Sequence, residues 1–268
     1  MGIPLSDWFV CLHVRESGYH SDDAKYLKTH RQRNASIENY TLAIERMIRE
    51  GGWVIRLGDP MMKRLPPMDK VIDYAHSPFR SELMDLYLVS QCRFYLGMNS
   101  GPVEFAWLFQ KRVVMTNDSE WLMAFPFKRE DLVIFKHVFS KSQNRFLSLD
   151  ETLEIPLFQN GEVNSLDNRD YIMYENSPVE IDEVVEECLR NDPASPQELQ
   201  DAFKQKRIRQ IHHSFERLIQ RGPLTREMIH QMYRITSRVE SPQGNLGARF
   251  LAENWHQNVN NLKNVAFC

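Results

Sequence analysis

Short apolar runs alternate with helix-like segments through the first two-thirds of the chain. Runs that are apolar on both strand faces are typical of parallel strands buried on both sides. The predicted strands are Trp8–Val14, Trp53–Leu57, Lys70–Tyr74, Arg93–Leu96, Arg112–Met115, Leu132–Phe135 and Tyr171–Tyr174. Helical periodicity occurs between them, at Ile37–Glu50 and Ser81–Ser90. This alternation through about residue 190 predicts an α/β fold with a doubly wound parallel sheet.

The stretch Cys92–Asn117 reads as a complete strand, turn, helix and strand. Ser100 suits the N-cap of the helix, and Pro102 suits its first turn, where a missing N–H has no cost. A strand that feeds a helix through a glycine-containing turn directs backbone N–H groups and partial positive charge beyond the sheet edge. The turn is therefore a candidate anion-binding site, although any α/β protein contains turns of this kind.

Composition changes after Asn191. Pro196–Gln220 is a long polar helix with one apolar stripe, and Ala248–Trp255 is a closing helix. We expect a sheet domain at residues 1–190 and a helical extension at residues 191–268.

Polar residues follow the predicted strands at their carboxyl ends, where open parallel sheets bind ligands. Arginine can fork onto a phosphate, turn N–H groups can bind anions, and carboxylates can accept sugar hydroxyls. The pattern predicts one anionic, polyhydroxylated ligand. The candidate binding residues are His13, Arg15, Arg56, Gly58, Asp59, Asn99, Ser100, Gly101, Asn117 and Glu175.

Several candidates also have a purely structural interpretation. His13 could be a core histidine bonded to a carbonyl, and Asp59 could only shape its turn. Arg15 could pair with Glu16 or Asp22 on the surface. Arg56 lies inside a strand and could form a buried ion pair with Asp73 or Asp85.

Composition narrows the functional classes. The chain has 268 residues, 42% of them hydrophobic, which is enough for a substantial core. Its net charge of −3 argues against a general nucleic-acid surface. The four cysteines have no paired spacing, so a reducing, cytoplasmic compartment is expected, with a peripheral membrane location as the alternative. No run approaches the roughly 18 apolar residues of a membrane span.

Motifs for other chemistries are missing from the sequence. There is no HExxH motif, and His212 and His213 are adjacent, so they should point to different sides of a helix. There is no GxSxG elbow of a serine hydrolase either. We expect no metal and no cofactor.

Six segments resemble a bacterial family of surface-polysaccharide glycosyltransferases. They are CLHVRES (Cys11–Ser17), RNASIENY (Arg33–Tyr40), WVIRLGDP (Trp53–Pro60), IDYAHSPFRSELMDLYL (Ile72–Leu88), CRFYLGMNSGP (Cys92–Pro102) and VVMTN (Val113–Asn117). The His-Val-Arg at a strand end is also similar to the first donor-binding motif of α1,2/α1,6-type fucosyltransferases. The resemblance covers about residues 8–120 and is looser at Glu175–Pro178.

The resemblance implies the Rossmann-like, donor-binding half of a GT-B glycosyltransferase that needs no metal. A nucleotide-sugar would be the donor and a glycan the acceptor. Arg15 would bind the diphosphate beside His13, with Ser100 and Gly101 on the phosphate side. Because the His-Val-Arg strand begins almost at the N-terminus, the acceptor half is expected from a second chain or domain. The catalytic base often comes from that half, so none is assigned.

Two other function classes stay open at this point. A non-catalytic partner module could recognise a nucleotide or glycan without transferring it. A nucleotide-sugar epimerase could use the same scaffold, and would yield free sugar isomers in place of a glycoside.

Overall fold

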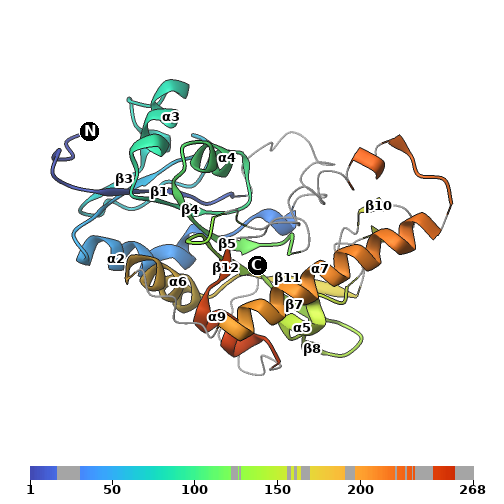
Figure 1. The fold of residues 1–268 in the computed structure, drawn as a ribbon. Coiled ribbons are helices and arrows are strands. Elements are labelled where there is room, and N and C mark those ends of the chain that lie inside the picture. The colour runs from blue at the N-terminus through green and yellow to red at the C-terminus, as the bar shows by residue number, and fades with distance from the viewer. Residues whose placement is uncertain are drawn as a thin grey trace.

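A computed structural model describes residues 1–16, 31–121, 126, 128–155, 158–159, 162–163, 170–190, 197–220, 222–226, 228–230, 232 and 244–256. Its main element is a seven-stranded parallel sheet in the order β12-β6-β5-β4-β1-β2-β3 (Figure 1). The strands are β1 (Phe9–His13), β2 (Trp53–Arg56), β3 (Val71–Ile72), β4 (Phe94–Gly97), β5 (Arg112–Asp118), β6 (Leu132–Phe135) and β12 (Asn245–Leu246). The predicted α/β fold with a parallel sheet is confirmed.

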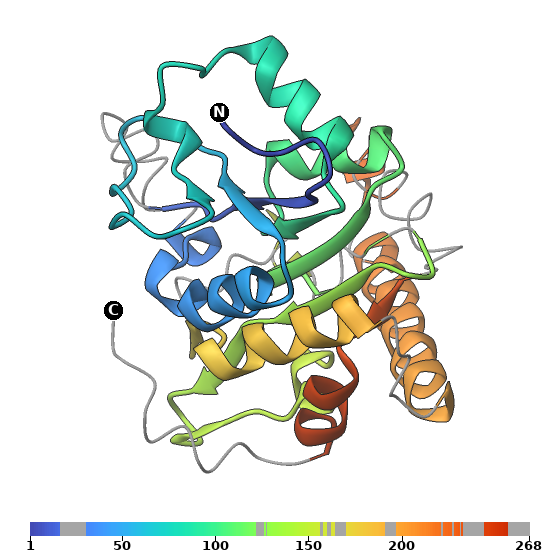
Figure 2. The same ribbon diagram turned by 90° about the vertical axis from the view of Figure 1, so that its left-hand side faces the viewer.

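Helices cover both faces of this sheet. Helices α2 (Thr41–Arg49) and α6 (Pro178–Arg190) lie side by side on one face, and α3 (Glu82–Gln91) and α4 (Gly101–Leu108) lie on the other (Figures 1 and 2). The central strands β1, β4 and β5 are almost wholly buried between these layers. Their continuous apolar sequences are explained by this double burial.

Local contacts and backbone conformation set the ends of α2 and α3. Ser81 caps α3 as its sequence suggests, because its Oγ accepts a hydrogen bond from Met84 N at 3.2 Å. The segment predicted as one helix from Ile37 begins with a 3-10 turn, Ile37–Tyr40, and continues as α2. Gly51 then ends the helix with φ +89°, a conformation that glycine adopts readily.

A second, antiparallel sheet has the order β11-β7-β8, formed by β11 (Tyr171–Tyr174), β7 (His137–Ser140) and β8 (Arg145–Phe146). Tyr171–Tyr174 is a strand as predicted, but it does not extend the parallel sheet. The short strands β9 (Phe158–Gln159) and β10 (Glu162–Val163) form a separate antiparallel pair, and α5 (Leu149–Thr152) follows β8.

The C-terminal elements attach to the edge of the main sheet. Strand β12 pairs with β6, and the Gln200 side chain on α7 (Gln197–Gln220) bonds both backbone groups of Leu246. Phe203 on α7 packs against Phe135 of β6, and α9 (Ala248–Asn254) follows β12. A boundary near residue 190 stays a prediction, and residues on both sides of it build the same sheet.

Candidate functional site

The strand order reverses between β1 and β4, since β2 follows on one side of β1 and β4 lies on the other. The order β3-β2-β1-β4-β5-β6 is the one in which dinucleotide-binding sheets leave a crevice at this point. His13 at the end of β1 lies opposite Gly97 at the end of β4. The segments that leave these two strands therefore emerge next to each other.

Gly97 permits this close approach. A Cβ at this position would lie 2.7 Å from the carbonyl oxygen of His13 and 2.8 Å from Cε1 of Tyr95. A larger residue would separate the ends of β1 and β4, where the candidate site begins.

A pocket of about 540 Å³ lies at this reversal. Its volume falls within the roughly 300–1,000 Å³ range of small-molecule sites. Six of the ten candidate residues line it: His13, Arg15, Gly58, Asp59, Ser100 and Gly101. Ligand binding by these six residues stays a prediction, and the structure brings them together as the sequence indicated.

His13 and Ser100 join the two strand ends. The Oγ of Ser100 is 3.1 Å from Nδ1 of His13. Ser100 occupies the N-cap of α4, as predicted, but its hydroxyl makes no capping bond to the helix. Burial, together with the positive charges of Arg56 and Arg15, lowers the pKa of His13 to about 4. The imidazole is therefore neutral at pH 7 and can hydrogen-bond without carrying charge.

Among the residues that the structure describes, three arginines line the pocket. Arg15 is only 8% exposed, although it follows directly after β1. Its expected surface partner Glu16 instead binds Arg56 at 2.6 Å, and Asp22 lies outside the described residues. Arg33 donates from Nη2 to the carbonyl oxygen of Asn99 at 2.8 Å, and Arg80 is exposed at the rim.

Sequence reasoning did not single out Arg33 or Arg80. Both lie in segments on which the expected likeness to glycosyltransferases rests, and this likeness was the one feature of the sequence that could have drawn attention to them. Neither follows a strand directly, so the strand-end criterion could not find them. The sequence suggested Asp85 of α3 only as an ion-pair partner for Arg56. In the structure Asp73 takes that place, and Asp85 lines the pocket.

Asp59 has two roles in the structure. Its Oδ1 accepts a hydrogen bond from Met61 N at 2.8 Å, which shapes the turn after β2. Its side chain also lines the pocket, together with Gly58. Gly58 has φ +151°, and a Cβ there would meet the Met62 sulfur at 2.3 Å, so the turn requires glycine.

Arg56 is not among the residues that line the pocket, so its contact with a ligand stays a prediction. Its side chain is fully buried. Nη2 donates to Glu16 Oε2 at 2.6 Å, and Nη1 donates to Lys63 O at 2.6 Å and to Asp73 Oδ1 at 3.2 Å. The alternative of an ion pair with Asp73 is therefore the one the structure contains. Glu16 lines the pocket, so the ion pair with Arg56 holds one of the lining side chains in position.

Asn99, Asn117 and Glu175 also lie outside the pocket lining. Asn99 donates from its side chain to Glu120 Oε2 at 3.0 Å. Glu175 accepts at 2.8 Å from the backbone of Ser36 and from the side chain of Asn39. In the structure these three residues join loops at the carboxyl edge of the sheet, and ligand binding by them stays a prediction.

Asn117 forms a reciprocal pair with Asn176. The side-chain oxygen of each accepts a hydrogen bond from the backbone N–H of the other, at 2.7 Å in both directions. Both residues are buried, and Asn117 has φ +52°. Asparagine tolerates this left-handed conformation better than most residues because its side chain can hydrogen-bond locally.

We predict that Asn117→Ala lowers the free energy of unfolding by about 1–3 kcal/mol, because it leaves the buried N–H of Asn176 without an acceptor. Urea denaturation followed by circular dichroism measures the change. Asn99→Ala is the matched control and should cost about 1 kcal/mol or less, since its side-chain bond is only partly buried. Equal losses in the two variants would contradict a structural role for the Asn117–Asn176 pair.

Asp118 at the end of β5 is a further polar residue that the sequence did not indicate. It is 1% exposed, and burial, followed by repulsion from Glu120, raises its pKa to about 7. Oδ1 accepts from Glu120 N at 3.0 Å, while Oδ2 accepts no hydrogen bond from the described residues. Asp118 does not line the pocket.

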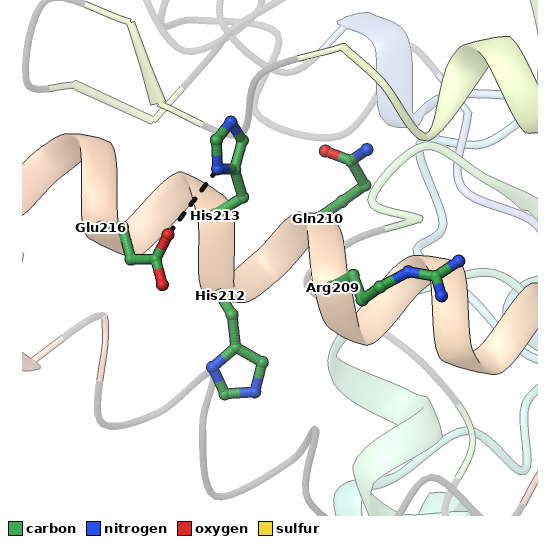
Figure 3. Close-up of a pocket in the computed structure, with 5 residues that line it drawn as sticks. All are labelled: Arg209, Gln210, His212, His213 and Glu216. Carbon is green, nitrogen blue, oxygen red and sulfur yellow. Dashed lines mark ion pairs between the residues drawn. The ribbon is translucent and has the colours of Figure 1, made fainter.

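The adjacent histidines of α7 lie as predicted. His212 and His213 project from different sides of the helix, and Nδ1 of His213 is 3.7 Å from Glu216 Oε2 (Figure 3). All five residues that line the roughly 450 Å³ pocket here come from this one helix. No described residue from another helix or strand lines this pocket.

Within the described ranges, no cluster of three or more His, Cys, Asp or Glu side chains is arranged to hold a metal ion. The expectation of a metal-independent site stays a prediction. None of the described helices has the length and apolar character needed to cross a membrane.

Comparison with protein-family models, with curated proteins and with solved structures gives no match. The likeness to surface-polysaccharide glycosyltransferases therefore stays an expectation from the sequence.

Proposed function

We propose that the chain binds a nucleoside diphosphate sugar in the pocket between β1 and β4, as the donor-binding domain of a GT-B glycosyltransferase that needs no metal. One observation carries the proposal: Arg15 and the N-terminus of α4 converge on a single pocket at the reversal of a parallel sheet. A guanidinium group and a helix N-terminus are both suited to phosphate oxygens.

The rest of the lining is consistent with the other parts of such a donor. Arg33 and Arg80 add positive charge for a diphosphate, and Asp59 and Asp85 can accept hydrogen bonds from ribose or sugar hydroxyls. Phe105 offers an aromatic ring at the same pocket. The mixture of arginines, carboxylates and apolar side chains fits a ligand with charged, polar and planar parts better than it fits a bare phosphate.

In the proposed reaction, an acceptor hydroxyl attacks the anomeric carbon while the bond from that carbon to the diphosphate oxygen breaks. The proton of the hydroxyl would pass to a general base that the acceptor half is expected to supply, and the nucleoside diphosphate leaves with the bonding electrons. Negative charge develops on the leaving oxygen, so Arg15 and the α4 N-terminus would stabilise the transition state more than the ground state. Neutral His13 would orient the Ser100 hydroxyl beside the phosphate.

Thermal denaturation in the presence of GDP, UDP, CMP, ADP and their sugars tests donor binding. A ligand at a hundred times its dissociation constant should add about 2.7 kcal/mol to the free energy of unfolding. We predict that Arg15→Ala weakens binding of the active nucleotide roughly 10- to 150-fold, as expected for loss of a charge-assisted contact worth about 1.5–3 kcal/mol. Isothermal titration calorimetry gives the affinities directly.

Arg209→Ala is the matched control, because Arg209 is an exposed arginine on α7, outside this pocket. It should leave the affinity unchanged. Equal binding by wild type and Arg15→Ala, or no stabilisation by any nucleoside diphosphate, would refute the donor-site proposal. Incubation of the active nucleotide-sugar with glycan acceptors then separates transfer from epimerisation, since an epimerase would release free isomers and no glycoside.

A further inference from the structure

Helices α3 and α4, together with the residues just outside their ends, carry six large apolar side chains that are exposed. We name this group the α3–α4 surface, and it consists of Phe79, Leu83, Tyr87, Phe105, Leu108 and Phe109. Leu83 is 78% exposed and Leu108 is 69% exposed. Leu83 and Tyr87 of α3 are four positions apart and Phe105 and Leu108 of α4 are three apart, so each pair shares one helix face, while Phe79 precedes α3 and Phe109 follows α4. Helices α3 and α4 are also packed against each other, so the two stripes adjoin (Figure 1).

The inner sides of the same helices are apolar as well. Leu88 and Val89 of α3, and Val103 and Ala106 of α4, are buried against the sheet. A surface helix normally turns a polar face outward, and a helix that is apolar on all sides is typical of a buried layer. The α3–α4 surface therefore has the composition of an interior face.

The size of this surface suits a stable protein interface. An aromatic side chain buries roughly 150–250 Å² when it is covered, so six large side chains with these exposures present on the order of 600 Å² of apolar area. A polar rim brings this close to the roughly 800 Å² that each partner contributes to a standard interface. Isolated monomers seldom expose more apolar area than this in one patch.

The charges around the surface are separated along the helices. Both helices link parallel strands, so both begin at the carboxyl edge of the sheet and run to the opposite edge. Three acidic residues, Glu82, Asp85 and Glu104, lie near their N-terminal ends, where Arg80 is the one exposed base in the described segment next to α3, so this end is net negative. Arg93 and Lys111 lie beyond their C-terminal ends, which are net positive. The acidic end of one copy is therefore complementary to the basic end of a second copy turned by 180°.

We propose that the α3–α4 surface is the interface of a homodimer, in which two copies pack α3 and α4 antiparallel across a two-fold axis. A two-fold interface uses the same patch on both subunits, and this patch is apolar with opposite net charges at its two ends, so it is complementary to a second copy of itself. The acidic residues at one end make an anionic lipid surface a poorer partner. Phe105 belongs both to the α3–α4 surface and to the pocket lining, so the two sites adjoin, but the dimer proposal does not depend on which ligand the pocket binds.

Sedimentation velocity of the full chain between 1 and 100 µM tests self-association. Wild type should sediment as a dimer, and Leu83→Lys combined with Leu108→Lys should raise the dissociation constant at least 100-fold. Both residues are exposed, so the variant should fold, and circular dichroism verifies this. Ile219→Lys, the same change at an exposed residue of α7, is the matched control and should remain dimeric. A monomeric wild type, or a dimer that survives the double substitution, would overturn the proposal.

Charge reversal tests the antiparallel arrangement. Glu82→Lys alone and Lys111→Glu alone should each weaken the dimer, roughly tenfold at low salt, because each places like charges opposite one another. The combined variant should recover dimerisation to within a few-fold of wild type. A combined variant that is weaker than either single variant excludes the antiparallel dimer. Co-sedimentation of monomeric wild type with phosphatidylglycerol vesicles would identify a lipid surface in its place.

Discussion

Arg56→Met is expected to lower the free energy of unfolding by about 3–5 kcal/mol, since removal of one partner from a buried ion pair leaves uncompensated charge. Methionine fills similar space, so the loss reports on charge more than on a cavity. Arg56 forms ion pairs with both Glu16 and Asp73, so its removal leaves two carboxylates without the cation that now lies between them. Guanidinium chloride denaturation at pH 7 gives the magnitude.

The loss should shrink at low pH, because protonation of Glu16 removes a negative charge that Arg56 would otherwise balance. Burial already raises the pKa of Glu16, with the positive charge of Arg56 opposing it, so the substitution should raise this pKa further. Arg145→Met is the matched control. Its ion pair with Glu151 has a similar distance of 2.6 Å, but the two side chains are 29% and 37% exposed, so the loss should be about 1 kcal/mol or less. Similar losses in the two variants would contradict the supporting role of Arg56.

Asp118→Asn should stabilise the protein, by up to about 4 kcal/mol above pH 7. The folded-state pKa of Asp118 is raised from 3.8 to about 7, so the fold favours the protonated carboxyl. Below about pH 4 both the folded and unfolded states are protonated, and the carboxyl has no effect on pH-dependent stability. Between pH 4 and pH 7 the unfolded state loses its proton first, so the contribution of Asp118 to wild-type stability falls as pH rises.

Asparagine removes this pH dependence because it carries no charge, and its side-chain oxygen can still accept from Glu120 N. Melting temperatures of wild type and variant at pH 5 and pH 8 measure the difference, which should be larger at pH 8. Asp201→Asn, an exposed position on α7, is the control and should change stability within about 0.5 kcal/mol at both pH values. A variant that is destabilised at pH 8 would show that the Asp118 carboxylate is favourably bound when ionised.

The parallel sheet could be predicted because its central strands are buried on both faces, which leaves a continuous apolar run in the sequence. Strand partners could not be predicted in the same way. Leu132–Phe135 and His137–Ser140 are separated by one residue, yet β6 joins the parallel sheet and β7 pairs antiparallel with β11. Apolar periodicity indicates which side of a strand is covered, but not which strand lies beside it.

The candidate site was predictable to the extent that parallel strands end at one edge. His13, Arg15, Ser100 and Gly101 meet there because β1 and β4 are neighbours. Whether the other predicted residues line the pocket depends on the direction of their side chains, which the sequence does not show. Arg56 is the last residue of β2, the neighbour of β1, but its side chain points into the protein, where Glu16 and Asp73 bind it. The loop arginines Arg33 and Arg80 reach the pocket through tertiary folding that no local pattern records.

The edge of the main sheet formed by β12 is protected against pairing with strands of other chains. Leu246 of β12 turns its backbone N–H and C=O away from β6, and the side-chain amide of Gln200 binds both, at 3.1 Å and 2.7 Å. A primary amide here takes the place of the next strand's peptide group. An unpaired edge strand is a template for strand addition by other chains, and amyloid-type growth begins at such edges. Gln200 therefore closes the sheet against intermolecular strand addition at this residue.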